Sequence, residues 1–105
     1  MTGIAVAETN NNNGIAGISG GWSTNEGCNY MPVRISYSAT DESLSAAGIE
    51  YAGENGAKVI SFSYGWARDV GEPTILRDKI DDVVDSDDIV FVAPAGNDDE
   101  ENRRH

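Results

Sequence analysis

The chain has 105 residues, the size of one small domain or of part of a larger one. Apolar residues make up 39% and charged residues 24%, a composition typical of a folded chain. Eighteen acidic residues against seven basic ones give a formal net charge of −11. This charge disfavours nucleic acids and anionic membranes as partners, because both attract positive surfaces. A solvated acidic surface is its simplest explanation, and such a surface can also bind Ca²⁺.

Cysteine content and apolar runs set further bounds. Cys28 has no second cysteine with which to form an internal disulfide. No apolar run approaches the roughly 20 residues that span a bilayer. The start, "MTGIAVAETN", lacks the basic residues and long apolar stretch of a signal peptide.

The first third of the chain is rich in small residues and asparagine. "TGIAVAE" is too short for its periodicity to distinguish the end of a helix from a strand. Residues 9–14, "TNNNNG", predict a loop, because asparagine tolerates a left-handed backbone. "IAGISGGW" suits close packing better than a regular helix.

The middle of the chain predicts a strand followed by a helix. Residues 30–36, "YMPVRIS", favour a strand, although Pro32 cannot donate to a central ladder. Residues 41–55 have helical spacing, with Asp41 as the N-cap and a stop at "ENG", where Asn55 or Gly56 takes the left-handed position. The predicted buried face comprises Leu44, Ala47, Gly48, Tyr51 and Ala52.

The last third predicts strand, helix and strand. Residues 58–65, "KVISFSYG", and 87–96, "DDIVFVAPAG", are the strands, and the second is apolar enough for a parallel strand covered on both faces. Between them, Pro73 suits the first turn of a helix that continues through 74–86. Its predicted apolar face is Leu76, Ile80, Val83 and Val84, and its predicted solvent face is Asp78, Asp81, Asp82 and Asp85.

The predicted fold class is therefore α/β. The order strand, helix, strand, helix, strand is the βαβαβ pattern of an open parallel sheet in a three-layer arrangement with right-handed crossovers. Residues 98–105, "DDEENRRH", form a charged tail that we expect to be frayed. In such sheets function gathers at the carboxyl ends of the strands, here "SFSYGW" and "APAGND".

Three motifs in order resemble the subtilisin-like serine peptidases, or subtilases. "AETNNNNGIAGI" is similar to the stretch after that family's catalytic histidine, and "NGAKVISFSYG" to its strand of the type V-I-N-M-S-x-G. "VFVAPAGND" is similar to the segment that carries its oxyanion-hole asparagine. The helix "AAGIEYAGENG" lies between them as in the family, so the resemblance covers residues 3 to 98.

The resemblance implies a peptidase site at the strand ends. Asn97 would be the oxyanion-hole donor. Without the resemblance, the dipeptide Gly96-Asn97 would indicate only an asparagine in a turn. The walls that bind a peptide or protein substrate would be Ser63, Tyr64, Gly65, Trp66, Ala93, Pro94, Ala95 and Gly96. Pro94 departs from the family's usual small residue, which alters the expected pocket shape.

The resemblance also implies a structural calcium loop. Its ligands would be Thr9, Asn11, Asn13 and Ile15. The family completes this shell with upstream residues that the chain lacks, so we expect an incomplete Ca²⁺ site and no catalytic cofactor. A plain asparagine-rich loop is the alternative.

The triad is missing from the sequence. The family's catalytic aspartate and histidine precede the matching region, and its G-T-S-M-A-x-P serine segment lies far downstream. His105 closes the charged tail and matches no motif of the family. We therefore expect residues 1–105 to be a central part of a subtilase catalytic domain that is inactive alone and can self-associate through exposed sheet edges. The resemblance suggests secretion. The alternative is a stand-alone, non-catalytic α/β module that binds a peptide or small ligand.

Overall fold

The computed structural model describes residues 2–22, 24–36, 41–64, 73–86 and 88–95. Contacts within the chain divide it into two units, Met1–Pro32 and Val33–His105. None of the helices in the described ranges is long and apolar enough to cross a bilayer.

The first unit begins with a short helix, α1, at Thr2–Val6, which settles the ambiguity of this segment in favour of a helix. The chain returns beside it after the asparagine-rich loop. The N–H of Gly17 donates to the carbonyl of Ala7 at 2.9 Å, and that of Ser19 to the carbonyl of Ala5 at 2.8 Å. A Cβ on Gly17 would overlap the backbone of Ala7, so this close approach requires glycine, as the small residues of the segment predict.

Among the described residues of the first unit, backbone hydrogen bonds rather than a buried core connect the segments. Helix α1 has no buried residue. The large apolar side chains around it are exposed, Ile18 by 91% and Trp22 by 66%. Burial of apolar surface is the main driving force for folding. The first unit, taken alone, therefore has little apolar burial to stabilise it.

The predicted strand over 30–36 is wrong, because these residues have no strand assignment. Pro32 has no N–H to donate, and no partner strand among the described residues pairs with this segment. Val33 and Ile35 instead lie against Gly48, where an added Cβ would meet the Ile35 side chain at 2.6 Å and that of Val33 at 3.2 Å. Within the second unit, the segment is therefore an extended cover over one side of a helix.

That helix, α2, runs over Glu42–Glu54 and has the caps that the sequence predicts. Asp41 is the N-cap, and its Oδ1 accepts the N–H of Leu44 at 3.0 Å. Asn55 is the C-cap, and Gly56 follows it with a φ of 83°, a left-handed conformation that glycine adopts without steric cost.

The buried face of α2 differs from the predicted one. Ser45, Ala46, Ile49 and Ala52 are buried, whereas Leu44 and Tyr51 are each 53% exposed. Ala47 is also exposed and Gly48 half-buried, so only Ala52 of the predicted set lies in the core. The buried stripe packs into the core that α2 shares with α3, where Ile49 lies in one cluster with Leu76 and Val83.

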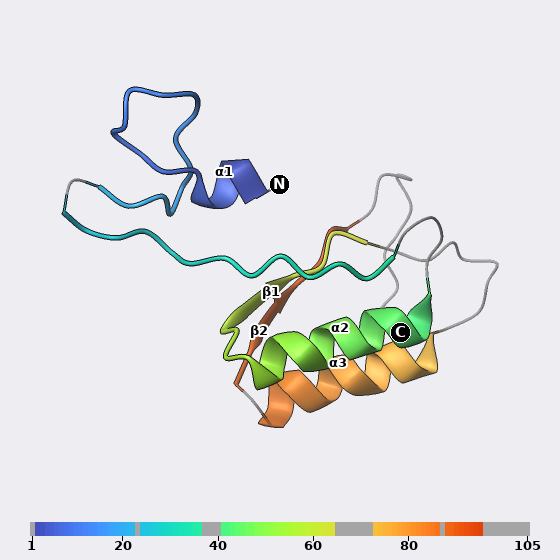
Figure 1. Cartoon of the computed structure of the whole chain (residues 1–105). Coiled ribbons are helices and arrows are strands. Elements are labelled where there is room, and N and C mark those ends of the chain that lie inside the picture. Colours follow the sequence, from blue (N-terminus) through green and yellow to red (C-terminus); the bar gives the residue numbers. More distant parts are fainter. Residues whose placement is uncertain (1, 23, 37–40, 65–72, 87, 96–105) are drawn as a thin grey trace. The chain divides into compact units, whose positions relative to one another are not determined.

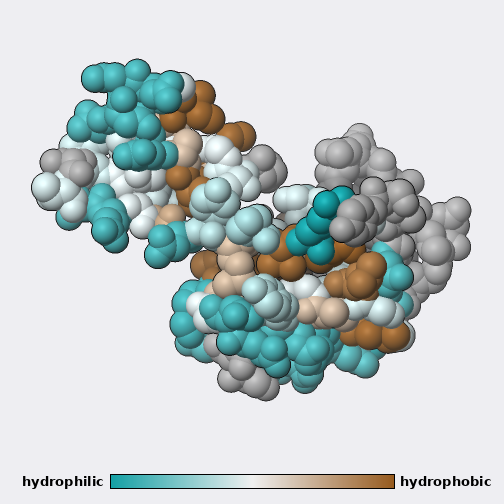
Figure 2. All heavy atoms as spheres, in the orientation of Figure 1, coloured by the Kyte–Doolittle hydropathy of each residue, from teal (hydrophilic) through white to brown (hydrophobic). Residues whose placement is uncertain are grey.

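Helix α3 covers Thr74–Ser86 and follows the predicted pattern more closely. Pro73 lies just before it and accepts the N–H of Arg77 at 3.1 Å, so the proline occupies the cap rather than the first turn. Leu76 and Val83 are buried, Ile80 is half-buried, and Val84 is 41% exposed, contrary to prediction. The predicted aspartates, Asp78, Asp81, Asp82 and Asp85, are all exposed, and hydrophilic residues gather over α3 in Figure 2.

The sheet consists of two parallel strands, β1 at Val59–Ser61 and β2 at Val90–Val92. They pair in the register Val59 with Val90, Ile60 with Phe91 and Ser61 with Val92. Both strands are shorter than predicted. The ladder continues one step further, because the N–H of Phe62 donates to the carbonyl of Val92 at 2.9 Å. The order β1, α3, β2 is a parallel crossover unit.

The core of the second unit lies between the sheet and its two helices. Ile49, Leu76, Val83 and Ile89 are buried, with Ile60, Phe62, Ile80 and Phe91 packed against them. Figure 1 shows α2 and α3 side by side next to the strand pair. The opposite face of the sheet is open within the described residues, where Val59 is 61%, Val90 58% and Val92 49% exposed. The described part therefore has two layers, and the predicted cover on both faces of residues 90–92 is absent from it.

An ion pair on the surface connects the two helices. Lys79 Nζ lies 3.0 Å from Glu50 Oε1 and 3.4 Å from Asp82 Oδ2. The hydrogen bond to Glu50, followed by the charges of Glu50 and Asp82, raises the pKa of Lys79 despite partial desolvation. Because the carboxylates of Glu50 and Asp82 are exposed, these ion pairs add little to stability.

Candidate functional site

The carboxyl ends of β1 and β2 meet at one edge of the second unit. Since Ser61 pairs with Val92 in a parallel register, the residues that follow each strand leave the sheet together. Ser63 and Tyr64 follow β1, and Ala93–Ala95 follow β2, all of them exposed. This is the edge at which open parallel sheets place their ligands. The described members of the predicted substrate walls are thus brought together on one side of the sheet.

Aromatic ring contacts connect this edge to the core of the second unit. The ring of Phe62 lies 6.1 Å from that of Tyr64 in an edge-to-face contact. It also lies 5.7 Å from the ring of Phe91. Ring pairs at such distances contribute about 0.5–1.5 kcal/mol beyond the apolar area they bury. Tyr64 is therefore tied through Phe62 to the core, although 37% of its own surface is exposed.

Four of the predicted site residues lie outside the described residues. Gly65 and Trp66 follow Tyr64, and Gly96 and Asn97 follow Ala95. The described backbone therefore reaches both sides of the predicted cleft and ends two residues before the predicted oxyanion-hole donor. The roles of all nine residues at this edge stay predictions.

The asparagine-rich loop of the first unit alternates in backbone handedness. Asn10, Asn12 and Gly14 have φ values of 59°, 55° and 63°, in the left-handed region that asparagine and glycine tolerate best. The residues between them have no positive φ. Of the predicted Ca²⁺ ligands, Asn11 and Asn13 are these intervening residues, and Thr9 and Ile15 flank the alternating segment.

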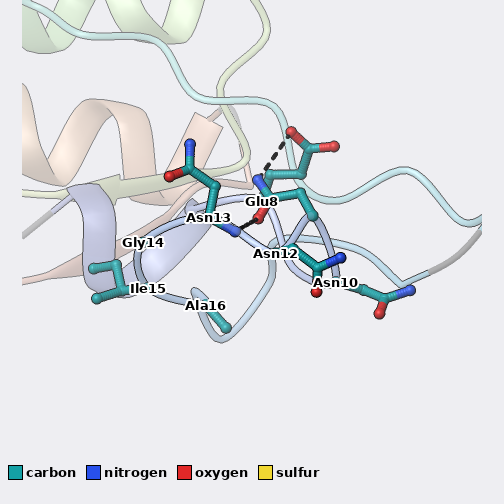
Figure 3. A pocket seen from close by; sticks show the side chains of 8 residues that line it. Glu8, Asn10, Asn12, Asn13, Gly14, Ile15 and Ala16 are labelled. Atoms are coloured by element: carbon teal, nitrogen blue, oxygen red, sulfur yellow. Dashed lines mark hydrogen bonds between the residues drawn. The ribbon is translucent and has the colours of Figure 1, made fainter.

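Oxygen atoms of the predicted ligands remain available in this loop. Within the part of the chain that the structure describes, the carbonyls of Thr9, Asn13 and Ile15 accept no protein hydrogen bond. The side chain of Asn11 is held in place, because its Oδ1 accepts the N–H of Asn13 at 3.1 Å. Its Nδ2 lies 3.5 Å from Glu8 Oε2, and Figure 3 marks both contacts. Glu8 and residues 10–16 line a hollow of about 200 Å³.

Two functional features were missed by sequence reasoning. Glu8 brings a carboxylate to the rim of the loop, and its place directly before Thr9 is a signal that could have identified it. Glu42 caps α3 from α2, because its Oε1 accepts the N–H of Leu76 at 3.1 Å. A contact over 34 positions leaves no local sequence signal. Among the described residues, no group of three or more His, Cys, Asp or Glu could hold a metal.

These features define an α/β protein whose candidate site lies at the carboxyl ends of parallel strands. The model of the subtilase family matches residues 1–105, and the chain belongs to that family. Its members are serine-type peptidases with an α/β fold. Comparison with curated proteins and with solved structures found no match.

Proposed function

We propose that the chain supplies the oxyanion-hole amide and the two substrate-binding strand ends of a subtilisin-like serine endopeptidase. The observation that supports this most strongly is the in-register parallel pairing of β1 and β2. It brings Ser63 and Ala93 to the same edge, and the sequence continues from there into Gly96 and Asn97.

An extended peptide is the ligand that this edge fits. Main-chain groups of the substrate would pair with those of the residues after β1 and β2, which gives affinity with little demand on the substrate's sequence. Gly65 and Gly96 would leave room for the approaching chain, and Trp66 would add an apolar wall. Pro94 lacks an N–H, so the wall after β2 would offer the substrate a carbonyl but no donor at that position.

Asn97 would act after the peptide is bound. Attack on the scissile carbonyl places negative charge on its oxygen, and a fixed side-chain N–H aimed at that oxygen stabilises the transition state more than the ground state. The attacking serine, the histidine base and the orienting aspartate would come from segments other than residues 1–105. We propose that the chain alone does not hydrolyse peptide bonds and that the enzyme to which it contributes is secreted.

Nuclear magnetic resonance tests the binding edge in the chain itself. A labelled chain titrated with an uncharged extended peptide should show shifts at the amides of Ser63, Tyr64, Ala93 and Ala95. The same peptide methylated on alternate backbone nitrogens is the control, and it should shift them much less because it cannot pair. Shifts confined to other residues, or equal shifts with both peptides, would contradict the proposal.

The loop of residues 9–15 is proposed as a structural Ca²⁺ site. Ca²⁺ takes six to eight oxygen ligands, and the available oxygens are the carbonyls of Thr9, Asn13 and Ile15 with the side chain of Asn11. Glu8 would add charge at the rim. We expect Ca²⁺ to raise the thermal midpoint of the chain, and Asn11→Ala to remove this shift. Asn12→Gly is the matched control, since glycine keeps the left-handed φ of 55°, and an equal Ca²⁺ response in both variants would exclude the site.

A further inference from the structure

The dipeptide Asn-Gly occurs twice, at 13–14 and at 55–56. Glycine after asparagine leaves its own backbone nitrogen unhindered, so this nitrogen can attack the preceding side-chain amide. Both asparagines are exposed, both glycines are left-handed, and a Cβ on either glycine would meet nothing within 4 Å. The two sites are thus matched in sequence and in space, and they differ in their hydrogen bonds.

Asn55 is held at the end of α2. Its Nδ2 donates to the carbonyl of Tyr51 at 2.8 Å, and its backbone N–H donates to the same oxygen at 3.1 Å. The N–H of Gly56 donates to the carbonyl of Gly53 at 3.0 Å. The group that would leave and the nitrogen that would attack are both bonded to the helix, so reaction requires the cap to open.

Asn13 has no such restraint. In the described part of the chain, its side-chain amide makes no hydrogen bond, and the N–H of Gly14 donates to no protein acceptor. Its own N–H donates to Asn11 Oδ1 at 3.1 Å, a bond that leaves the side chain free to rotate. The attacking nitrogen and the amide carbon at this site can therefore approach without breaking a described interaction.

We propose that Asn13 is a site of spontaneous deamidation and that Asn55 is its protected counterpart. The Gly14 nitrogen attacks Cγ of Asn13, the N–Cγ bond forms, and the Cγ–Nδ2 bond breaks. Ammonia leaves with the proton that the Gly14 nitrogen loses, which closes a succinimide ring. Water then adds to either ring carbonyl and gives an aspartyl or an isoaspartyl linkage.

Both products change the asparagine-rich loop. Each adds a negative charge, and the isoaspartyl product also inserts a methylene group into the backbone at position 13. If the loop is the Ca²⁺ site proposed above, the reaction alters one of its carbonyl ligands. The deamidation itself does not depend on that proposal, because the hydrogen-bond difference exists without any cation.

The two sites can be compared within one sample. The full chain is incubated at mildly alkaline pH with a chelator, its fold is followed by far-UV circular dichroism, and peptides covering each site are quantified by mass spectrometry. Heavy-oxygen water marks the hydrolysed product. We expect the product at Asn13 to form at least about tenfold faster than at Asn55, since reaction at Asn55 requires the hydrogen bonds of its Nδ2 and of the Gly56 N–H to open.

Two controls attribute this difference to the structure. In concentrated urea the two rates should converge, because the cap of α2 is lost. Asn13→Gln should remove the reaction at the first site and leave the rate at the second unchanged. Equal rates at both sites in the absence of urea, or faster reaction at Asn55, would overturn the proposal, as would a rate difference that persists in urea.

Discussion

The hydroxyl of Ser45 lies fully buried on α2, and within the described residues it has no hydrogen-bond partner. A buried polar group without a partner loses its bonds to water and gains nothing in return. We expect Ser45→Ala to raise the free energy of unfolding by about 1 kcal/mol more than Ser43→Ala does. Ser43 is an exposed residue of the same helix, so both variants gain the same helix propensity. Urea titration measures the difference, and equal effects of the two changes would mean that the hydroxyl is satisfied.

At the scale of the element, substitutions in α2 can show which of its two apolar faces packs into the core. Ile49 is 3% exposed and Leu44 53%. We expect Ile49→Ala to lower the free energy of unfolding by about 2–5 kcal/mol, the range for truncating a large buried aliphatic side chain. Leu44→Ala should cost less than about 1 kcal/mol. A larger loss for Leu44 than for Ile49 in chemical denaturation would support the face that the sequence predicts and contradict the structure.

Local signals predicted the elements better than the contacts between them. Asp41 as a cap, Gly56 as a stop and the exposed aspartates of α3 each follow from spacing within one helix, and the structure has all of them. The face of α2 depends on how closely α3 approaches, which spacing alone does not encode. The same holds for residues 30–36, whose strand pattern is real but whose pairing needs a partner strand.

For the candidate site, the sequence likewise predicted the position of the residues better than their contacts and roles. Parallel order predicted that the residues after the two strands, Ser63 and Ala93 among them, would lie at one edge, because parallel strands have their carboxyl ends at the same edge of a sheet. Resemblance alone assigned roles to the residues there, and those roles remain predictions. Glu42 acts through a contact over 34 positions that no motif specifies, whereas Glu8 directly precedes the asparagine-rich loop and could have been identified from that position.

At the scale of the whole molecule, we propose that the sheet face left open among the described residues mediates self-association. Val59, Val90 and Val92 present an apolar patch, while the net charge of −11 makes two copies repel. We expect self-association that strengthens with ionic strength, as salt screens this repulsion. Analytical ultracentrifugation should show Val90→Lys reducing it far more than Ile75→Lys does. Ile75 is the control because it is 54% exposed on α3, and equal effects would place the contact elsewhere.

The most direct test of the proposed peptidase role concerns Asn97. Residues 1–97 would replace the matching segment of an active subtilisin-like endopeptidase, with the number of competent sites counted by a serine-directed inhibitor. We predict that Asn97→Ala lowers kcat per site by about 10² to 10³ with little change in KM, the magnitude that loss of the oxyanion-hole asparagine has in subtilisin itself. Asn29→Ala, at an exposed asparagine, should leave kcat unchanged. An inactive parent chimera, or equal kcat in the two variants, would contradict the account.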